Sequence, residues 1–289
     1  MSLKTRTITG VIFGAVMIGG TLASAYSCAA LFIIVGLCCL WEFTAISNSV
    51  DKDSSPVAVV NTRRVLITAL GILPALWIGA SILGYIKMDI HQATLLLPVF
   101  FGLFIFELFG KSNRPFEQIG LLLLAILYIG VPTALVVMIA LAQPDYGNLL
   151  VMAMLAIVWA SDSFAYLGGS QIGKTPFFKR ISPKKTWEGI ACGVAGAMLV
   201  GYICSLVFTP LAYSIGQWLV IAVVACVFGI LGDLVESLLK RSLGIKDSGT
   251  ILPGHGGFLD RFDAFILLVP FTFFAIVYLL NDSRFTSWL

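Results

Sequence analysis

The stretch from Ser237 to Asp263 reads SLLKRSLGIKDSGTILPGHGGFLDRFD, and it lies between two long apolar runs, residues 214–236 and 262–281. Each run is long enough to cross a bilayer, since a membrane span needs about 20 predominantly apolar residues. The charged segment between them is therefore expected at a membrane surface. Charges of both signs are costly close to hydrocarbon, which indicates that these residues bind something.

The rest of the chain is also strongly apolar: 59% of its 289 residues are hydrophobic and 11% are charged. A soluble domain contains about 25% charged residues. The composition therefore argues against an ordinary soluble enzyme and predicts an all-α, polytopic helical bundle in a membrane. The apolar stretches predict nine spans, at residues 8–26, 28–47, 65–86, 93–110, 119–142, 148–168, 189–212, 214–236 and 262–281.

The distribution of cations predicts the orientation, because cytoplasmic loops are rich in Lys and Arg. With the amino terminus in the cytoplasm, all but two of the 18 Lys and Arg residues lie inside, and Lys87 and Arg284 lie outside. This orientation places both polar loops, residues 169–188 and 237–261, on the cytoplasmic side, where nucleotides are. Val11–Leu22 resembles a secretory signal, but the next apolar run follows almost directly, which favours a retained first span.

We expect two parts in this chain. Residues 1–145 would contain spans one to five, which form a scaffold and the dimer contacts. Residues 146–289 would form the catalytic part, with spans six to nine and the two polar loops.

Four polar residues share one face at the end of the eighth predicted span. Asp233, Glu236, Ser237 and Lys240 have the spacing i, i+3, i+4 and i+7, which places them on one side of a helix. Lys240 and Arg241 would complement the dipole at a helix carboxyl terminus without any further role. Acids are unfavourable at that end, so Asp233 and Glu236 indicate a function, and carboxylates suit a metal ion.

The following turn, Pro253–Gly257, contains three glycines and His255 and precedes Asp260, Arg261 and Asp263. An acid in the first turn of a helix is often only a cap or a dipole partner. That explanation accounts for one acid but not for two acids, an arginine and a nearby histidine together. His255 is either a structural residue or a direct substrate contact, and the glycines allow backbone to approach a ligand.

The loop at residues 169–188 ends in Lys184, Lys185, Thr186 and Glu188. These cations fit either the general excess of positive charge inside the membrane or a polyphosphate site, and we favour the polyphosphate. The earlier pattern Gly168-x4-Gly-Lys-Thr matches a P-loop by letter. A P-loop must follow a strand and open a helix, whereas here a span precedes and Pro176 follows, so we interpret the match as chance.

Acids also occur within the spans. Asp162 lies in the sixth predicted span near its cytoplasmic end, and an intramembrane acid is by default functional. Glu107 is expected near an interface, and Glu42 can hydrogen-bond within the bundle or reach its surface. We therefore assign Asp162 to the site and leave Glu42 and Glu107 out of it.

The spacing of Ser237, Lys240-Arg241, Lys246-Asp247, Gly249, Leu252-Pro253, His255–Phe258, Asp260-Arg261 and Asp263 resembles the signature of phosphatidate cytidylyltransferases, also called CDP-diacylglycerol synthases. Further blocks are similar to that family, namely Asp162 with Tyr166, Gly173-Lys174, Ile181–Gly189 and Gly232–Ser237. Gly169-Ser170 departs from the glycine–arginine pair expected in many relatives, which puts one cationic contact in doubt. The resemblance covers the carboxyl-terminal half in detail.

The resemblance implies transfer of CMP from CTP to phosphatidate by a nine-span homodimer. From the compact length and the lack of an organellar leader we expect a bacterial inner membrane, and from the cation distribution an active site that faces the cytoplasm. The resemblance also implies Mg²⁺ held by Asp233 and Asp260, and a second, monovalent cation such as K⁺; Glu236 is a further candidate ligand. The partners would be membrane lipid and the two substrates, with no nucleic acid. The catalytic candidates are Asp233, Asp260, Lys240, Arg241, Lys246 and Arg261. The substrate-binding candidates are Lys184, Lys185, Thr186, Glu188, Ser237, Asp247, His255, Gly256, Gly257, Asp263 and Asp162.

Other functions fit the pattern less well. A CTP-dependent kinase of polyprenols, or a synthase acting on ether lipids, would use nearly the same polar residues. A secondary transporter would show repeated halves and paired broken helices, which the sequence does not show. A CDP-alcohol phosphotransferase would need an Asp-Gly…Ala-Arg…Gly…Asp…Asp run, which is absent.

Overall fold

The computed structural model describes residues 3–48, 57–86, 94, 96–109, 114–245, 247–249, 251, 254 and 256–285. Most of them lie in helices: α1 (Leu3–Ala23), α2 (Ala25–Asn48), α3 (Val57–Ile82), α5 (Leu96–Phe109), α6 (Pro115–Ala125), α7 (Val131–Ala142), α8 (Gly147–Ile172), α9 (Trp187–Val207), α10 (Ile215–Ser242) and α11 (Leu259–Phe274). π-Helical turns at Ile126–Gly130 and Ala275–Leu279 continue α6 into α7 and extend α11. Short 3-10 turns occur at Thr209–Leu211 and Ser283–Phe285.

The helices confirm the expected all-α membrane bundle. In the described part of the chain, seven helical segments are long and apolar enough to cross a membrane, and Thr7–Ala23 is a shorter apolar stretch. Helix α5 contributes 14 residues. Each of the predicted spans coincides with one of these segments. The number that actually cross, and the side on which the amino terminus lies, stay predictions.

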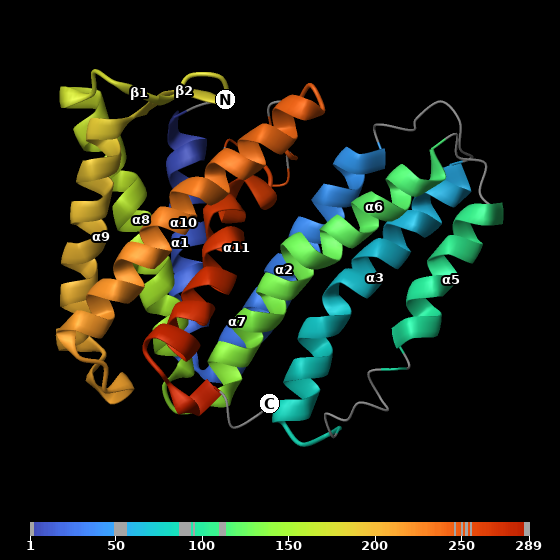
Figure 1. Cartoon of the computed structure of the whole chain (residues 1–289), viewed down its shortest axis with the longest axis horizontal. Coiled ribbons are helices and arrows are strands. Elements are labelled where there is room, and N and C mark those ends of the chain that lie inside the picture. Colours follow the sequence, from blue (N-terminus) through green and yellow to red (C-terminus); the bar gives the residue numbers. More distant parts are fainter. Residues whose placement is uncertain are drawn as a thin grey trace.

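Successive helices run in alternating directions across the bundle, except that α7 continues α6 in the same direction (Figure 1). As a result, the amino end of α1, residues 173–186 and the described residues between 243 and 258 lie at the same end of the molecule, which we call the loop end. Both polar loops predicted from the sequence therefore lie together. The carboxyl end of the chain lies at the opposite end (Figure 1).

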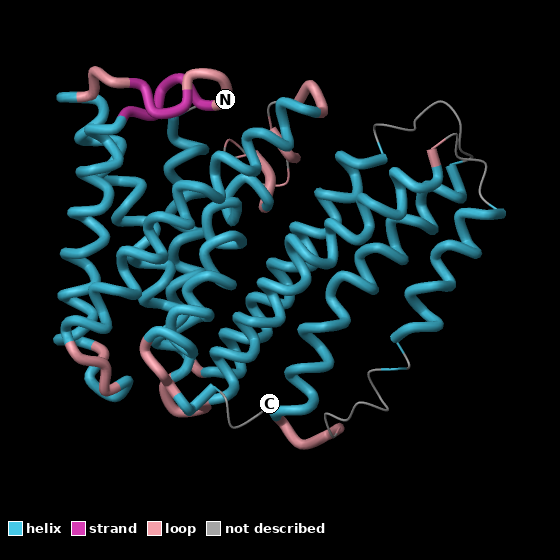
Figure 2. Tube along the Cα trace, in the orientation of Figure 1, coloured by secondary structure: helices cyan, strands magenta, loops and turns pink. Residues whose placement is uncertain are grey.

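The loop end contains a β-hairpin that the sequence reading treated as loop. Strands β1 (Pro176–Phe178) and β2 (Ser182–Thr186) are antiparallel, with Pro176 opposite Thr186, and Figure 2 shows them at this end only. The Phe177 and Trp187 rings pack edge to face with centroids 4.7 Å apart, which anchors the hairpin on the start of α9. Because a strand follows Lys174-Thr175, the interpretation of the P-loop match as chance is confirmed.

Some helix ends differ from those predicted. Helix α10 begins with a capping box between Ser214 and Gln217 and extends to Ser242, beyond the predicted end at residue 236. Lys240 and Arg241 are therefore helical. The predicted end was too early because it was taken from the end of the apolar run. A helix can continue beyond such a run with polar residues, since its backbone hydrogen bonds do not depend on apolar side chains.

Close approaches between helices bring the polar residues together. α8 packs against α9, and α10 packs against α11. A Cβ on Gly232 of α10 would lie 2.7 Å from the carbonyl oxygen of Asp263, and one on Gly189 of α9 would lie 2.9 Å from that of Ala165. Only glycine fits such contacts. The first contact brings α11 against the turn of α10 that carries Asp233.

Candidate active site

Lysine 240 links two helices at the loop end. Its Nζ lies 2.7 Å from Oδ1 of Asp260 on α11 and forms an ion pair with Glu236 one turn earlier on α10. The side chain of Glu236 is fully buried. The predicted common face of Asp233, Glu236 and Lys240 is thus continued across to α11, and one cation serves two carboxylates.

The other oxygen of Asp260 is fixed by backbone. Oδ2 accepts hydrogen bonds from the amides of Ser248 and Gly257, each at 2.9 Å. Gly256 directly precedes the Gly257 amide and has φ of 84°, a left-handed conformation that glycine adopts without strain. The predicted role of the glycines, which is to let backbone approach a ligand group, applies first to the protein's own Asp260.

A second lysine approaches from the hairpin. Lys185 of β2 forms an ion pair with Asp233 of α10, and both side chains are partly exposed. The Asp233 and Asp263 side chains also interact directly. Two carboxyl groups in contact require a proton or a cation to offset their repulsion. The cluster formed by Asp233, Glu236, Asp260 and Asp263 with Lys185 and Lys240 is called the acid–lysine cluster below.

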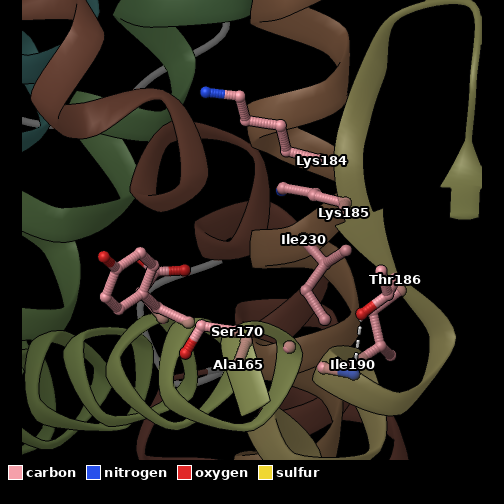
Figure 3. Close-up of a pocket in the computed structure, with 11 residues that line it drawn as sticks. Ala165, Ser170, Lys184, Lys185, Thr186, Ile190 and Ile230 are labelled. Atoms are coloured by element: carbon pink, nitrogen blue, oxygen red, sulfur yellow. Dashed lines mark hydrogen bonds between the residues drawn. The ribbon is translucent and has the colours of Figure 1, made fainter. Parts of the chain in front are cut away.

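A cavity of ≈ 400 Å³ opens beside this cluster, between α8, β2, the start of α9 and α10. Figure 3 shows Lys184 and Lys185 above it, with Ser170 of α8 and Ile230 of α10 on other sides. Its wall is mostly apolar. The predicted residues that line it are Asp162, Lys184, Lys185 and Thr186, and the residues that the sequence reading did not assign are Ala165, Tyr166, Gly169, Ser170, Gly189, Ile190 and Ile230.

The remaining predicted residues lie around these two features. Ser237 is half-buried on α10, and Arg241 is exposed, with Nη1 donating to the carbonyl of Ile245 at 3.4 Å. Asp247 and Arg261 are exposed. Lys246 and His255 lie outside the described residues. Substrate contacts by all of these residues stay predictions.

Glu188 has a clear contact within the loop itself. Its carboxylate accepts hydrogen bonds from the amides of Lys174, at 3.1 Å, and Thr175, at 3.1 and 3.2 Å. Thr186 caps α9 by accepting from the amide of Gly189 at 3.2 Å. These bonds show how the two residues hold the hairpin on α9, and a contact of either with substrate stays a prediction.

Sequence reasoning missed the position of Glu42. This residue of α2 lies at the loop end, where Oε2 accepts hydrogen bonds from the Leu259 amide at 2.9 Å and the Ser248 hydroxyl at 3.2 Å. The available signal was its charge inside an apolar stretch, which was the same argument that selected Asp162. Its partners lie more than 200 residues away in the sequence, so nothing local identified them.

The donor chemistry of the acid–lysine cluster fits the predicted Mg²⁺. Within the described residues, no three His, Cys, Asp or Glu side chains are grouped to hold a metal ion by themselves. Magnesium does not need such a group, because it is commonly held by one or two carboxylates together with waters and substrate phosphates. The direct contact between Asp233 and Asp263 supplies hard oxygen donors where a cation would relieve repulsion. Ligation by Asp233, Asp260 or Glu236 stays a prediction.

Comparison with known proteins decides the family. The model described as "Cytidylyltransferase family" matches residues 4–279, nearly the whole chain. The chain belongs to the cytidylyltransferase family. It is a nucleotidyltransferase and an integral membrane protein.

Individual relatives agree with this assignment. The cytidylyltransferase is 33% identical over 277 residues to a phosphatidate cytidylyltransferase of Bacillus subtilis, covering 96% of this chain and 98% of the relative. It is 29% identical over 273 residues to that of Staphylococcus saprophyticus, covering 93% and 96%. It is 37% identical over 188 residues to that of Rickettsia bellii, covering 62% and 80%.

Proposed function

We propose that this cytidylyltransferase transfers CMP from CTP to phosphatidate, giving CDP-diacylglycerol and pyrophosphate. The names of the relatives supply the reaction, and one feature of the structure supports it. Lys185 lines a mostly apolar cavity and also forms an ion pair with Asp233. A lipid phosphate needs this combination, because its acyl chains require apolar surroundings while its phosphate requires cations at the membrane edge.

In the proposed reaction, a phosphate oxygen of phosphatidate attacks the α-phosphorus of CTP. A new phosphorus–oxygen bond forms there, and the bond to the bridging oxygen of the β-phosphate breaks, so that pyrophosphate leaves with the electron pair. A phosphate monoester has its second pKa near about 6 and is already ionised at neutral pH. The reaction therefore requires no strong general base, and its main difficulty is the meeting of two polyanions.

Lysines of the loop end are placed to offset that repulsion. Lys184 and Lys185 border the cavity, where they would face the lipid phosphate. Lys240 lies between Glu236 and Asp260, where it would hold the cluster in shape and face the nucleotide phosphates. We propose the same electrostatic role for Arg241, Lys246 and Arg261, because arginine binds phosphate through two parallel hydrogen bonds.

We further propose that Asp233 and Asp260 hold Mg²⁺, with Glu236 as an additional ligand and a monovalent cation such as K⁺ nearby. When bound, Mg²⁺ would neutralise the negative charge that develops on the α-phosphoryl group and pyrophosphate. Asp260 already has Oδ2 fixed by two amides, so its orientation is set before any cation arrives. Pre-set ligands of this kind need no reorganisation during the reaction.

The cellular setting is also a proposal. The relatives are bacterial proteins, and the cation distribution supports a loop end that faces the cytoplasm. We propose a homodimer in the bacterial inner membrane, with the active site facing the cytoplasm and the dimer contacts within residues 1–145. Chemical labelling of a cysteine introduced at the exposed Ile251 in intact cells, compared with permeabilised cells, would test the orientation.

Pyrophosphate release by purified protein in detergent tests the reaction. The assay compares CTP with ATP, and phosphatidate with diacylglycerol and with a polyprenol, at fixed Mg²⁺. We expect release only with CTP and phosphatidate together, and a lipid product that carries CMP. Formation of CDP and a phosphorylated lipid alcohol would replace this proposal by the kinase alternative. Silence with both nucleotides, in protein shown to be folded, would reject a nucleotide-dependent lipid reaction.

A further inference from the structure

A carboxylate of the amino-terminal half lies under the loop that leads into α11 and Asp260. Glu42 belongs to α2, yet its side chain lies against Ser248, Gly249, Gly257 and Leu259 and is only 3% exposed. Oε2 accepts hydrogen bonds from the Leu259 amide, at 2.9 Å, and from the Ser248 hydroxyl, at 3.2 Å. Two points of the loop, eleven residues apart in sequence, are thus tied to one oxygen of a distant helix.

Glycines make room for this carboxylate. A Cβ on Gly257 would lie 2.3 Å from Oε2 of Glu42, and one on Gly249 would lie 2.7 Å from Oε1. Any side chain at either position would push Glu42 out of the loop or the loop away from α2. The buried carboxylate of Glu42 therefore requires glycine at both 249 and 257.

The residues tied to Glu42 are the residues that fix Asp260. Ser248 donates its hydroxyl to Glu42 and its amide to Asp260 Oδ2, at 2.9 Å. Gly257, which packs on Glu42, donates its amide to the same Asp260 oxygen, also at 2.9 Å. The loop backbone at Ser248 and Gly257 therefore lies between the two carboxylates of Glu42 and Asp260 and contacts both.

We propose that Glu42 is a positioning residue of the transfer reaction, which orients Asp260 by fixing the Ser248 and Gly257 amides. The proposal rests on the proposed function of Asp260. Burying a carboxylate in a membrane bundle is costly. A packing role alone would be met by a leucine, whereas two converging hydrogen-bond donors of the loop require an acceptor at this place.

The chain offers a matched control for this proposal. Glu107 of α5 is also buried, at 7% exposed, and its two oxygens bind Arg63 of α3, each at 2.7 Å. Both glutamates thus belong to helices of the amino-terminal half and both make two buried hydrogen bonds. Only Glu42 touches the loop of Asp260. Figure 1 shows α5 on the far side of the bundle from α10 and α11.

Kinetics of four variants test the proposal: Glu42→Ala, Glu42→Gln, Glu107→Gln and Asp260→Asn. We expect Glu42→Ala to lower kcat by about 10–100-fold, the usual effect of losing a group that orients a ligand residue, with the KM for phosphatidate nearly unchanged. Glu42→Gln keeps an acceptor oxygen and should recover most of the loss. Glu107→Gln should lower the thermal midpoint but leave kcat within about 2-fold.

Two further measurements separate positioning from general destabilisation. Hydrogen–deuterium exchange should rise at the Ser248, Gly257 and Leu259 amides in Glu42→Ala and stay unchanged there in Glu107→Gln. Combining Glu42→Ala with Asp260→Asn should cost no more than Asp260→Asn alone, because effects transmitted through one residue are not additive. If Glu42→Ala does not fold, Ser248→Ala, which removes one donor and keeps the buried acid, replaces it in both measurements.

The outcomes distinguish failure of this proposal from failure of the proposed site. Wild-type kcat in folded Glu42→Ala, or equal losses of kcat in Glu42→Ala and Glu107→Gln, would overturn the positioning role while a large loss in Asp260→Asn preserves the site. Near-normal turnover in Asp260→Asn would instead reject the site, and the role of Glu42 with it.

Discussion

Two polar clusters lie next to opposite ends of α10, and they differ in how completely their groups are paired. Before the amino end, Asp282 accepts hydrogen bonds from Arg284 at 2.7 and 2.6 Å and from the Tyr213 hydroxyl. Arg284 also donates to the carbonyl of Leu211 at 3.0 Å and lies over the Tyr213 ring, 4.8 Å from its centre. This cluster is closed, because one acid matches one base and the remaining donors have acceptors.

The acid–lysine cluster near the carboxyl end of α10 is open, which means that its acids outnumber its bases. Its ion pairs join two lysines, Lys185 and Lys240, to three carboxyl groups, and a fourth acid, Asp263, interacts with Asp233. A large cavity adjoins it through Lys185. Closed clusters stabilise a fold, whereas a partly exposed cluster with excess acid is suited to binding a cation and a charged ligand. The two clusters, which lie next to opposite ends of α10, thus differ as expected for a structural site and for the proposed active site.

Replacing an equivalent acid at each end gives the largest contrast. Asp260→Asn keeps the volume of the side chain but removes its charge, and we expect kcat to fall by at least about 100-fold, since charge neutralisation dominates phosphoryl transfer. Asp282→Asn should leave kcat within about 2-fold. Both are measured by CTP-dependent pyrophosphate release per folded enzyme. Normal turnover in Asp260→Asn would remove the functional half of the comparison.

Two lysines of the hairpin, Lys185 and Lys179, test whether the cavity next to the acid–lysine cluster binds the lipid phosphate. Lys185→Met keeps most of the apolar chain but removes the partner of Asp233 and one cation of the cavity. We expect kcat/KM for phosphatidate in mixed micelles to fall by about 10–100-fold, as for loss of one charged contact to phosphate. Lys179→Met is the control, because Lys179 is exposed in the same hairpin and does not line the cavity. Equal effects of the two substitutions would mean that only the net charge of the loop matters.

Much of the fold was predictable because membrane helices require long apolar stretches. The acids and bases of residues 233–263 were also predictable, since charge between two spans is costly unless it is used. Their grouping into pairs was not, because the contacts Lys185–Asp233 and Lys240–Asp260 depend on how α10 meets α11 and β2. The hairpin was missed because strands of 3 and 5 residues carry too little periodicity to be recognised.

Glu42 shows a different limit of the sequence. Its partners are a backbone amide and a serine hydroxyl in another half of the chain, and a backbone amide has no residue type. The excess of charge in an apolar run indicated that Glu42 needed partners, but not where they were. Glu107 carried the same indication and has only Arg63 as its ion-pair partner among the described residues. Two equal signals in the sequence therefore belong to different parts of the structure.

The smallest expected effects concern the closed cluster, where stability rather than activity should change. Burial alone would raise the pKa of Asp282, but hydrogen bonds from Arg284 and Tyr213 outweigh it and lower that pKa below its usual value. A lowered folded-state pKa stabilises the fold above the unfolded pKa of about 3.9, and this stability is lost as the pH falls through the folded-state value.

Asp282→Asn should therefore lower the free energy of unfolding by about 1–3 kcal/mol at pH 7, as for loss of a buried charged hydrogen-bond partner. Tyr213→Phe, which leaves Arg284 in place, should cost about 0.5–1.5 kcal/mol. Denaturant unfolding in detergent measures both free energies. It is repeated between pH 3 and 7, a range that includes the unfolded-state pKa of Asp, about 3.9. The deficit of Asp282→Asn should shrink on acidification, because the wild-type carboxylate becomes protonated and loses the same interactions. A deficit that stays constant down to the lowest pH would show that packing, and not the charge of Asp282, closes this end of the bundle.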